Sequence, residues 1–310
     1  MNWLNRLVKE KLAALCQEKG IPVLWDEPMK YHTSFKIGGP AAVMCIPKDR
    51  DQLFCALDFA RRENLPVWYV GNGSNLLVKD EGIDGMVILL DSEFGGEIAV
   101  EGETLIAPSG KKLSAVCAAA AKESLTGLEF AWGIPGSVGG AVYMNAGAYG
   151  GEMKDCLLWA EYLSPQGKIV RLSKEDLALS YRHSCFMQPQ YKDCCIVRAA
   201  FSLTKGEPEA IRQQMDHVME QRKAKQPLEY PSAGSTFKRP QGAFAAQLID
   251  QCGLRGKQVG GAQVSTKHAG FVINLGDACC NDVLNLTAQV RECVKQQTGY
   301  ELELEVQLIP

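Results

Sequence analysis

The sequence predicts a protein of the α+β class with more than one domain, and three observations support this. Short apolar strands alternate with amphipathic helices between residues 21 and 204, as in α/β units. A glycine-rich turn follows the strand at residues 67–70, the usual place of a ligand-binding turn in such units. Residues 205–310 form a third region of helices and strands, and 310 residues suffice for two or three substantial cores.

The first part of the chain reads as one helix followed by an α/β unit. Leucine and valine recur at helical spacing over residues 2–19, and Gly20 closes this amphipathic helix. We then predict a strand at 41–46, a helix at 49–64, and strands at 67–70 and 87–90.

A second α/β unit follows. It begins with an alanine-rich helix at 113–123, continues through a glycine-rich segment, and has strands at 157–163, 169–172 and 195–203. Ser173 and Asp176 have the spacing of a capping box, which predicts a short helix beginning at Ser173.

The third region opens with a helix at 209–225 that ends before Gln226 and Pro227. We predict a helix at 244–252, a strand at 270–274, a helix at 282–298 and an alternating strand at 301–309. The predicted domains are therefore 1–204, with subdomains at about 21–92 and 93–204, and 205–310. The closing strand at 301–309 is free to pack back on the first domain.

Charge and hydropathy exclude several classes of partner. The net charge of −3 gives no basic field for nucleic acid, and no dense Lys/Arg block suggests a membrane surface. The first twenty residues carry charges throughout, so they lack the apolar core of a signal peptide, and no later segment reaches membrane-spanning length. We expect a cytoplasmic protein that binds neither nucleic acid nor membrane.

The twelve cysteines are expected to be reduced, because the chain is long and has no export signal. There is no CxxC pair, and the adjacent pairs Cys194-Cys195 and Cys279-Cys280 have a poor spacing for zinc. We interpret the cysteines as small core residues and predict no metal site.

Two glycine-rich segments indicate a ligand. Residues 133–152 (GIPGSVGGAVYMNAGAYGGE) interleave seven glycines with apolar side chains, unlike a polar linker, and such a backbone can bring amide groups close to a phosphate or a flat ring. Residues 66–78 (PVWYVGNGSNLLV) place a turn of small polar residues between apolar runs. Leu76 stands where the dinucleotide fingerprint GxGxxG needs its third glycine, and a simple hairpin connection is the alternative for this turn.

With these pieces in order, the chain resembles the UDP-N-acetylenolpyruvoylglucosamine reductases (UDP-N-acetylmuramate dehydrogenases), flavoenzymes of bacterial cell-wall precursor synthesis. The motifs that carry the resemblance are TSFKIGG at 33–39, GNGSNLL at 71–77, the glycine-rich 133–152, Tyr181-Arg182, SAGSTFKRP at 232–240 and Glu305-Val306. The spacing after Arg182 leaves no room for the tyrosine-bearing insertion of the longer class, so the chain looks like the shorter class.

The resemblance implies an FAD-binding fold of the vanillyl-alcohol-oxidase type, in which two α/β subdomains hold FAD and a third domain binds the UDP-sugar. It implies a monomer that binds FAD without a covalent bond and uses NADPH as co-substrate. Hydride passes to C3 of the enolpyruvyl group, and a proton is added at C2. His32 is the histidine close enough in sequence to a flavin-side motif to check for flavin attachment.

The resemblance also assigns roles to residues. Arg182 would stabilise charge on the substrate carboxylate, Ser235 would donate the proton, and Glu305 would complete the catalytic set. From pattern alone Glu305 reads as a solvated edge residue, because Glu301, Glu303 and Glu305 alternate with apolar residues. Lys238 would favour the serine alkoxide or hold a phosphate. The remaining expected contacts are Tyr181 and Arg239 for substrate, and Gly71, Asn72, Gly73, Ser74, Asn75, Gly133, Ile134, Pro135, Gly136, Ser137 and Gly140 for FAD.

Two other functions stay open at this point. One is a flavin dehydrogenase of the same fold with another substrate, against which the SAGSTFK motif argues. The other is a flavin or nucleotide-sugar binding protein without chemistry, against which the joint presence of Arg182, Ser235 and Glu305 argues.

Overall fold

The structure, a computed structural model, describes residues 5–310 and divides them into two compact units. Among the described residues, the first unit comprises residues 5–25, Ala42–Asn72 and Asp84–Glu220. The second comprises Asp26–Ala41, Gly73–Ile83 and Gln221–Pro310. We describe each unit by itself.

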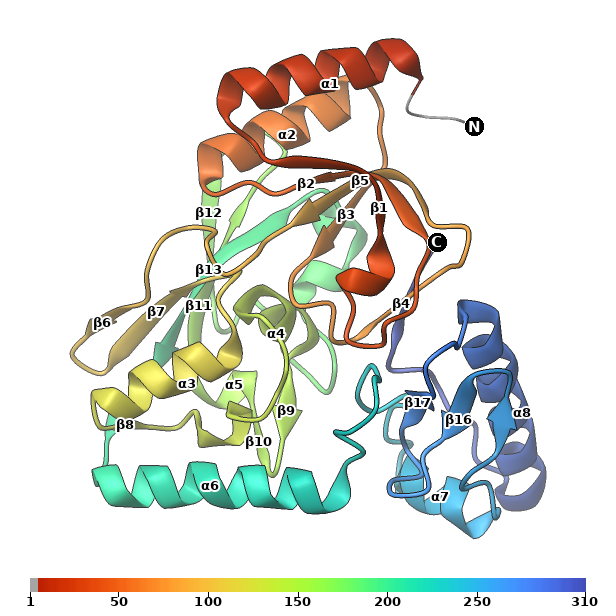
Figure 1. Ribbon diagram of the computed structural model, residues 1–310. Coiled ribbons are helices and arrows are strands. Elements are labelled where there is room, and N and C mark those ends of the chain that lie inside the picture. The colour runs from red at the N-terminus through yellow and green to blue at the C-terminus, as the bar shows by residue number, and fades with distance from the viewer. Residues whose placement is uncertain (1–4) are drawn as a thin grey trace. The chain divides into compact units, whose positions relative to one another are not determined.

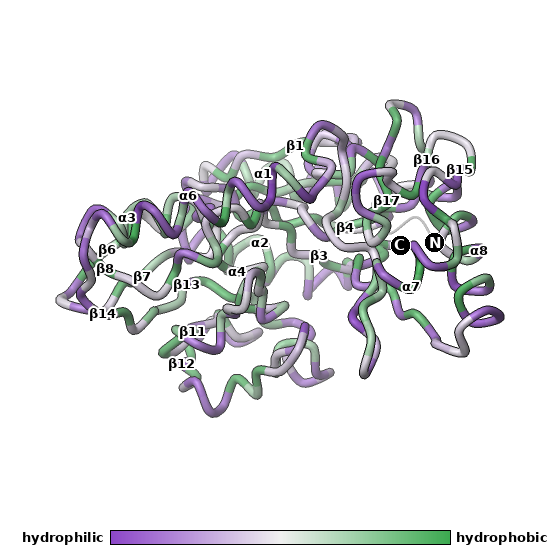
Figure 2. Tube along the Cα trace, turned by 90° about the horizontal axis from the view of Figure 1, so that it is seen from below, coloured by the Kyte–Doolittle hydropathy of each residue, from purple (hydrophilic) through white to green (hydrophobic). Residues whose placement is uncertain are grey.

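The first unit begins with α1 (Arg6–Lys19) and α2 (Arg50–Arg62), which lie side by side on a four-stranded sheet (Figure 1). Hydrophilic and hydrophobic residues alternate along α1 (Figure 2), and its apolar side joins the buried core of this sheet. Residues 2–4 of the predicted helix lie outside the described residues. The strand order is β1 (Val23–Pro28), β2 (Pro40–Cys45), β5 (Ile83–Leu89) and β3 (Val67–Val70).

A second sheet of the first unit has five strands in the order β6, β7, β13, β11 and β12, and each strand pairs antiparallel with its neighbours. Its strands are β6 (Ala99–Glu101), β7 (Thr104–Pro108), β11 (Leu157–Leu163), β12 (Ile169–Ser173) and β13 (Cys195–Ser202). The remaining elements of this part are α3 (Leu113–Lys122), β8 (Leu125–Thr126), η2 (Glu129–Ala131), α4 (Val138–Met144), β9 (Gly147–Ala148), β10 (Gly151–Glu152), α5 (Met153–Cys156), η3 (Cys185–Met187), η4 (Pro189–Tyr191), β14 (Thr204–Lys205) and α6 (Pro208–Lys225).

The second unit packs α7 (Ala245–Gln251) and α8 (Cys280–Thr298) with a three-stranded antiparallel sheet. That sheet consists of β15 (Gln258–Val259), β16 (Ala262–Val264) and β17 (Val272–Asn274). Phe35, Ile37 and Leu77 are buried in the same core, which is why two early segments of the chain belong to this unit. These segments contribute η1 (Met29–Tyr31) and β4 (Leu76–Val78), and β4 pairs in parallel with β18 (Gln307–Ile309).

Two predicted elements are wrong. The capping-box hydrogen bonds between Ser173 and Asp176 form, but the chain makes only a turn there, because Ala178 adopts a φ of 47° and ends the helical geometry. The predicted strand at 301–309 is regular only at Gln307–Ile309. A bend at Val306 interrupts it, so Glu305 and Val306 are both buried although they are consecutive.

None of the helices within residues 5–310 combines the length and apolar character that crossing a bilayer requires. In the same residues, no three His, Cys, Asp or Glu side chains are arranged to hold a metal ion, and the cysteines are free thiols.

Candidate active site

The two glycine-rich turns meet in the first unit. Gly71 directly follows β3, and a Cβ added there would lie 2.1 Å from Oγ of Ser137, the N-cap of α4. The Asn72 side chain donates a hydrogen bond to the carbonyl of Pro135. The absence of a side chain at Gly71 therefore allows these two turns, more than sixty residues apart, to touch.

The first turn presents unpaired amides. Within residues 5–310, no hydrogen-bond acceptor is found for the N–H groups of the four consecutive residues Asn72, Gly73, Ser74 and Asn75. Successive backbone amides of this kind form an anion-binding concavity. In the second turn, Gly140 is exposed, and a Cβ added there would meet only Ser137 Oγ at 3.5 Å. Both turns thus leave room for a ligand to approach the backbone.

Other residues in and near the first turn make contacts within the protein. A Cβ at Gly73 would lie 1.9 Å from the His32 carbonyl oxygen, so this glycine is required by packing within the second unit. Asn75 Nδ2 donates to the carbonyl of Glu305 at 3.1 Å. His32 Nε2 lies 2.8 Å from Oε1 of Glu27, so this ring nitrogen already has a partner within the protein.

Arg182 lies at the corner of a tight hairpin in the first unit. Ser180 and His183 exchange two backbone hydrogen bonds, of 3.1 and 3.0 Å, which leaves Tyr181 and Arg182 as the connecting residues. Arg182 has a φ of 53°, a conformation that costs a residue with a side chain on the order of 1 kcal/mol. Its Nη2 donates to the Gly147 carbonyl at 3.2 Å, and its guanidinium lies 5.1 Å from the ring centre of Tyr181.

Ser235 lies in a short irregular segment of the second unit. Ser232 pairs with Ile273 of β17, and Phe237 pairs with Leu304 of the closing segment. The residues between them leave the ladder, and Gly234 has a φ of 75° at this point. A half-buried serine is thereby displayed at the tip of a segment held on both sides.

Thr236 fixes this segment to both neighbours. Its N–H donates to the Gly270 carbonyl at 2.8 Å, and its Oγ1 accepts from the N–H of Val272 at 2.9 Å. Its carbonyl accepts from the N–H of Glu305 at 2.8 Å. These three hydrogen bonds set the position of Ser235 relative to Glu305.

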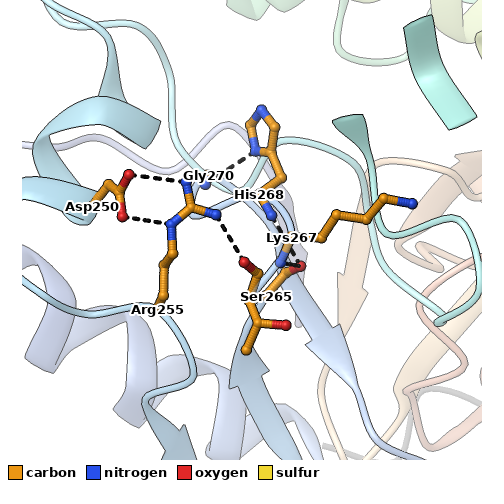
Figure 3. Close-up of polar contacts among 7 residues, drawn as sticks. Asp250, Arg255, Ser265, Lys267, His268 and Gly270 are labelled. Atoms are coloured by element: carbon orange, nitrogen blue, oxygen red, sulfur yellow. Dashed lines mark hydrogen bonds and ion pairs between the residues drawn. The ribbon is translucent and has the colours of Figure 1, made fainter. Parts of the chain in front are cut away.

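Residues 266–270 form the loop whose Gly270 carbonyl accepts from Thr236, and side chains stabilise this loop (Figure 3). Arg255 binds the carboxylate of Asp250 and donates to the Thr266 carbonyl at 2.8 Å. Nδ1 of His268 accepts from the N–H of Gly270 at 3.2 Å. Burial, together with the nearby charge of Arg255, lowers the pKa of His268 below its ordinary value of 6.5, so the imidazole is neutral at pH 7.

The three closing carboxylates differ sharply in exposure. The side chains of Glu301 and Glu303 are 72% and 74% exposed, whereas Glu305 is 8% exposed as a residue. The interpretation of Glu305 as a solvated edge residue is therefore wrong, because the bend at Val306 turns it inward. Lys238 Nζ lies 3.3 Å from Oε2 of Glu303, and the Arg239 guanidinium lies 4.8 Å from the ring centre of Phe244.

The structure thus places Ser235 and Glu305 together in the second unit and Arg182 in the first. Sequence reasoning missed Thr236 and also Asn145, a fully buried residue that contacts the Arg182 hairpin. Neither has a local signal for its role, because the partners that link Thr236 and Asn145 to the site, Val272 and Ser180, lie 36 and 35 residues away.

Comparison with known proteins agrees with these features. The FAD binding domain family matches residues 40–173, and the UDP-N-acetylenolpyruvoylglucosamine reductase C-terminal domain family matches residues 226–309. The fold and site accordingly define an FAD-dependent oxidoreductase.

The full-length matches are more specific. The UDP-N-acetylenolpyruvoylglucosamine reductases of Lachnoclostridium phytofermentans and Caldanaerobacter subterraneus are 47% and 48% identical and cover 99% of this chain, with 98% and 99% of their own lengths aligned. The crystal structure of the reductase from Thermus caldophilus is 35% identical, with a TM-score of 0.77 over 94% of this chain and 99% of that one. The chain belongs to the UDP-N-acetylenolpyruvoylglucosamine reductase family. The expected family, α+β fold class and FAD cofactor are confirmed.

The residues present fit FAD. Four consecutive unpaired amides and the open backbone at Gly140 suit a pyrophosphate and a flat ring that approach closely.

Proposed function

We propose that this enzyme uses NADPH to reduce the enolpyruvyl group of UDP-N-acetylglucosamine enolpyruvate, forming UDP-N-acetylmuramate for peptidoglycan synthesis. The observation that carries the proposal is the arrangement around Thr236: Ser235 precedes it in the chain, and the backbone N–H of buried Glu305 donates to its carbonyl, so the residues that carry the hydroxyl and the carboxyl are held close together. Bound FAD supplies the hydride chemistry, from NADPH to C3 of the enolpyruvyl group.

The protein must stabilise the charge that develops when C3 gains a hydride. Electrons then move through C2 into the carboxylate, whose oxygens approach two negative charges. The guanidinium of Arg182 can hold a carboxylate through two parallel hydrogen bonds that strengthen as this charge grows. Arg182 adopts the left-handed backbone conformation at the corner of the hairpin, so its backbone is held in one conformation there.

Ser235 is the proposed proton donor to C2. A serine hydroxyl is a weak acid, and it suffices here because the carbon it protonates is strongly basic and the hydroxyl is held in place. Glu305 acts protonated in this proposal, because a neutral carboxyl donates a hydrogen bond to the developing enediolate, whereas a carboxylate would repel it. Glu305 is 8% exposed, and burial disfavours the charged form of a carboxyl, whereas the side chains of Glu301 and Glu303 are exposed to solvent.

The remaining assignments follow the same proposal. Tyr181, Lys238 and Arg239 contact the UDP-sugar, and residues 71–75, 133–137 and 140 contact FAD. Residues 1–204 serve FAD binding and 205–310 substrate binding, in a cytoplasmic monomer. Lys238, whose Nζ lies 3.3 Å from Oε2 of exposed Glu303, would hold a substrate phosphate or favour the alkoxide of Ser235.

Stopped-flow kinetics of Ser235→Ala test the proposal, with Ser232→Ala in the same segment as the matched control. We expect flavin reduction by NADPH to stay near the wild-type rate, while reoxidation by the enolpyruvyl sugar slows by roughly 10²- to 10⁴-fold. Ser232→Ala should keep both rates. If flavin reduction falls as much as reoxidation does, Ser235 is structural and the proton has another source.

A further inference from the structure

The second half of the glycine-rich run, residues 141–152, has no role in the proposed flavin cradle. Asn145 lies at its centre as the C-cap of α4, with a φ of 42° and no exposed surface. Asparagine tolerates this left-handed conformation better than most residues. Backbone geometry alone would allow glycine here, so the asparagine side chain calls for a further reason.

Every polar atom of the Asn145 side chain has a partner in the first unit. Nδ2 donates to Oε2 of Glu152 at 2.7 Å and to the Ser180 carbonyl at 2.9 Å, and Oδ1 accepts from the N–H of Lys154 at 2.9 Å. The contact with Ser180 matters most, because Ser180 is the first residue of the Arg182 hairpin.

The same short stretch holds the hairpin at further points. The Gly147 carbonyl accepts from the Arg182 guanidinium, and the Tyr143 carbonyl accepts from Ser184 Oγ at 2.7 Å. Residues 143–147 thus contact the hairpin at Ser180, at Arg182 and at Ser184, which directly follows it. Of these contacts, the one made by Asn145 comes from a side chain of the run and can be removed without altering its backbone.

We propose that Asn145 is a positioning residue for Arg182: its hydrogen bond to the Ser180 carbonyl holds the hairpin so that the guanidinium meets the substrate carboxylate. The inference rests on the proposed role of Arg182. It assigns to the end of the glycine-rich run a function in substrate reduction rather than in flavin binding.

Two variants distinguish the effect of the Asn145 side chain from that of its backbone conformation. Asn145→Asp keeps the Oδ1 acceptor and tolerance of positive φ, but it loses both donors and adds a buried carboxyl beside Glu152. Asn145→Gly keeps the backbone conformation and loses the side chain without adding a charge. In both we expect reoxidation by the enolpyruvyl sugar to slow by roughly 10- to 100-fold, as for a misplaced catalytic group, while FAD content and reduction by NADPH stay unchanged.

A double-mutant cycle with Arg182→Ala distinguishes positioning from general damage. If Asn145 acts through Arg182, Asn145→Asp should change the rate of Arg182→Ala by less than about two-fold. The matched control is Asn274→Asp in the second unit, where a buried asparagine likewise donates to a backbone carbonyl, of Phe35 at 3.1 Å, and accepts from backbone N–H groups. Its effect should multiply with that of Arg182→Ala.

Equal losses from Asn145→Asp in the two backgrounds, a parallel fall in NADPH-dependent reduction, or the same coupling in the Asn274 control would overturn the inference. If Arg182→Ala reduces the sugar at the wild-type rate, Arg182 has no role in reduction, and the inference fails together with that part of the proposed function. If Arg182→Ala slows reduction, a crystal structure of the Asn145→Gly holoenzyme tests the inference separately: a displaced Ser180–His183 hairpin supports it, and an unmoved hairpin overturns it.

Discussion

Thr236→Val probes the residue that joins Ser235 to its neighbours. Valine has nearly the shape of threonine but cannot accept the hydrogen bond from the N–H of Val272. Thr236 is only 3% exposed, so this N–H would be left buried without a partner. An orphaned buried donor costs about 1–3 kcal/mol, so the free energy of unfolding should fall by this amount. Thr236→Ser keeps the acceptor and loses only a methyl group, which costs about 1 kcal/mol.

Thr236→Val should also slow one step of the reaction. Thr236 is adjacent to Ser235, and a shift of about 1 Å in a catalytic group can cost roughly 100-fold in rate. We expect slower reoxidation by the enolpyruvyl sugar in Thr236→Val, normal reduction by NADPH, and near wild-type rates in Thr236→Ser. Urea unfolding of the holoenzyme, stopped-flow kinetics and hydrogen exchange at the Val272 amide measure the three effects. A Thr236→Val enzyme as stable and as fast as Thr236→Ser would refute the reasoning.

Further predictions concern the cofactor, the serine loop and the buried carboxyl. Gly140→Ala should weaken FAD binding, measured by flavin fluorescence, without destabilising the apoprotein, whereas Gly139→Ala should destabilise the apoprotein because its Cβ would lie 3.0 Å from Cβ of Ser109. FAD should be released by acid or heat, and flavin retained on the denatured chain would contradict this. Because the folded pKa of His268 lies below 6.5, its contribution to stability is complete above that pH and is lost as the pH falls through the folded pKa; His268→Asn should flatten the pH dependence of Tm over this window. Glu305→Gln should keep clearly more activity than Glu305→Ala or Glu305→Asp, and a protonated-carboxyl infrared band in the substrate complex should disappear in it; equal inactivity and no band would show an ionised role.

Local sequence signals predicted the regular elements well. The strands at 67–70 and 157–163 have the predicted bounds, and α6 at Pro208–Lys225 begins one residue before its prediction. These elements depend on side-chain periodicity and on end signals within a few residues of each other, which a sequence displays directly. The family was likewise identified from the sequence, because several short motifs, among them TSFKIGG, GNGSNLL and SAGSTFKRP, occur in the order that the family shows.

The sequence did not predict how these elements are shared between the two units or how the site is held. Asp26–Ala41 and Gly73–Ile83 belong with the C-terminal region because their apolar residues complete its core, a choice that no local pattern specifies. Burial of Glu305 depends on the bend at Val306 and on contacts with Thr236 and with Asn75, the latter 230 positions away. Such contacts form between single side chains and distant backbone groups, so they leave no periodic trace in the sequence. The sequence determined which chemical groups this protein carries, and the tertiary structure decided which of them are buried, because burial depends on neighbours that only the folded chain supplies.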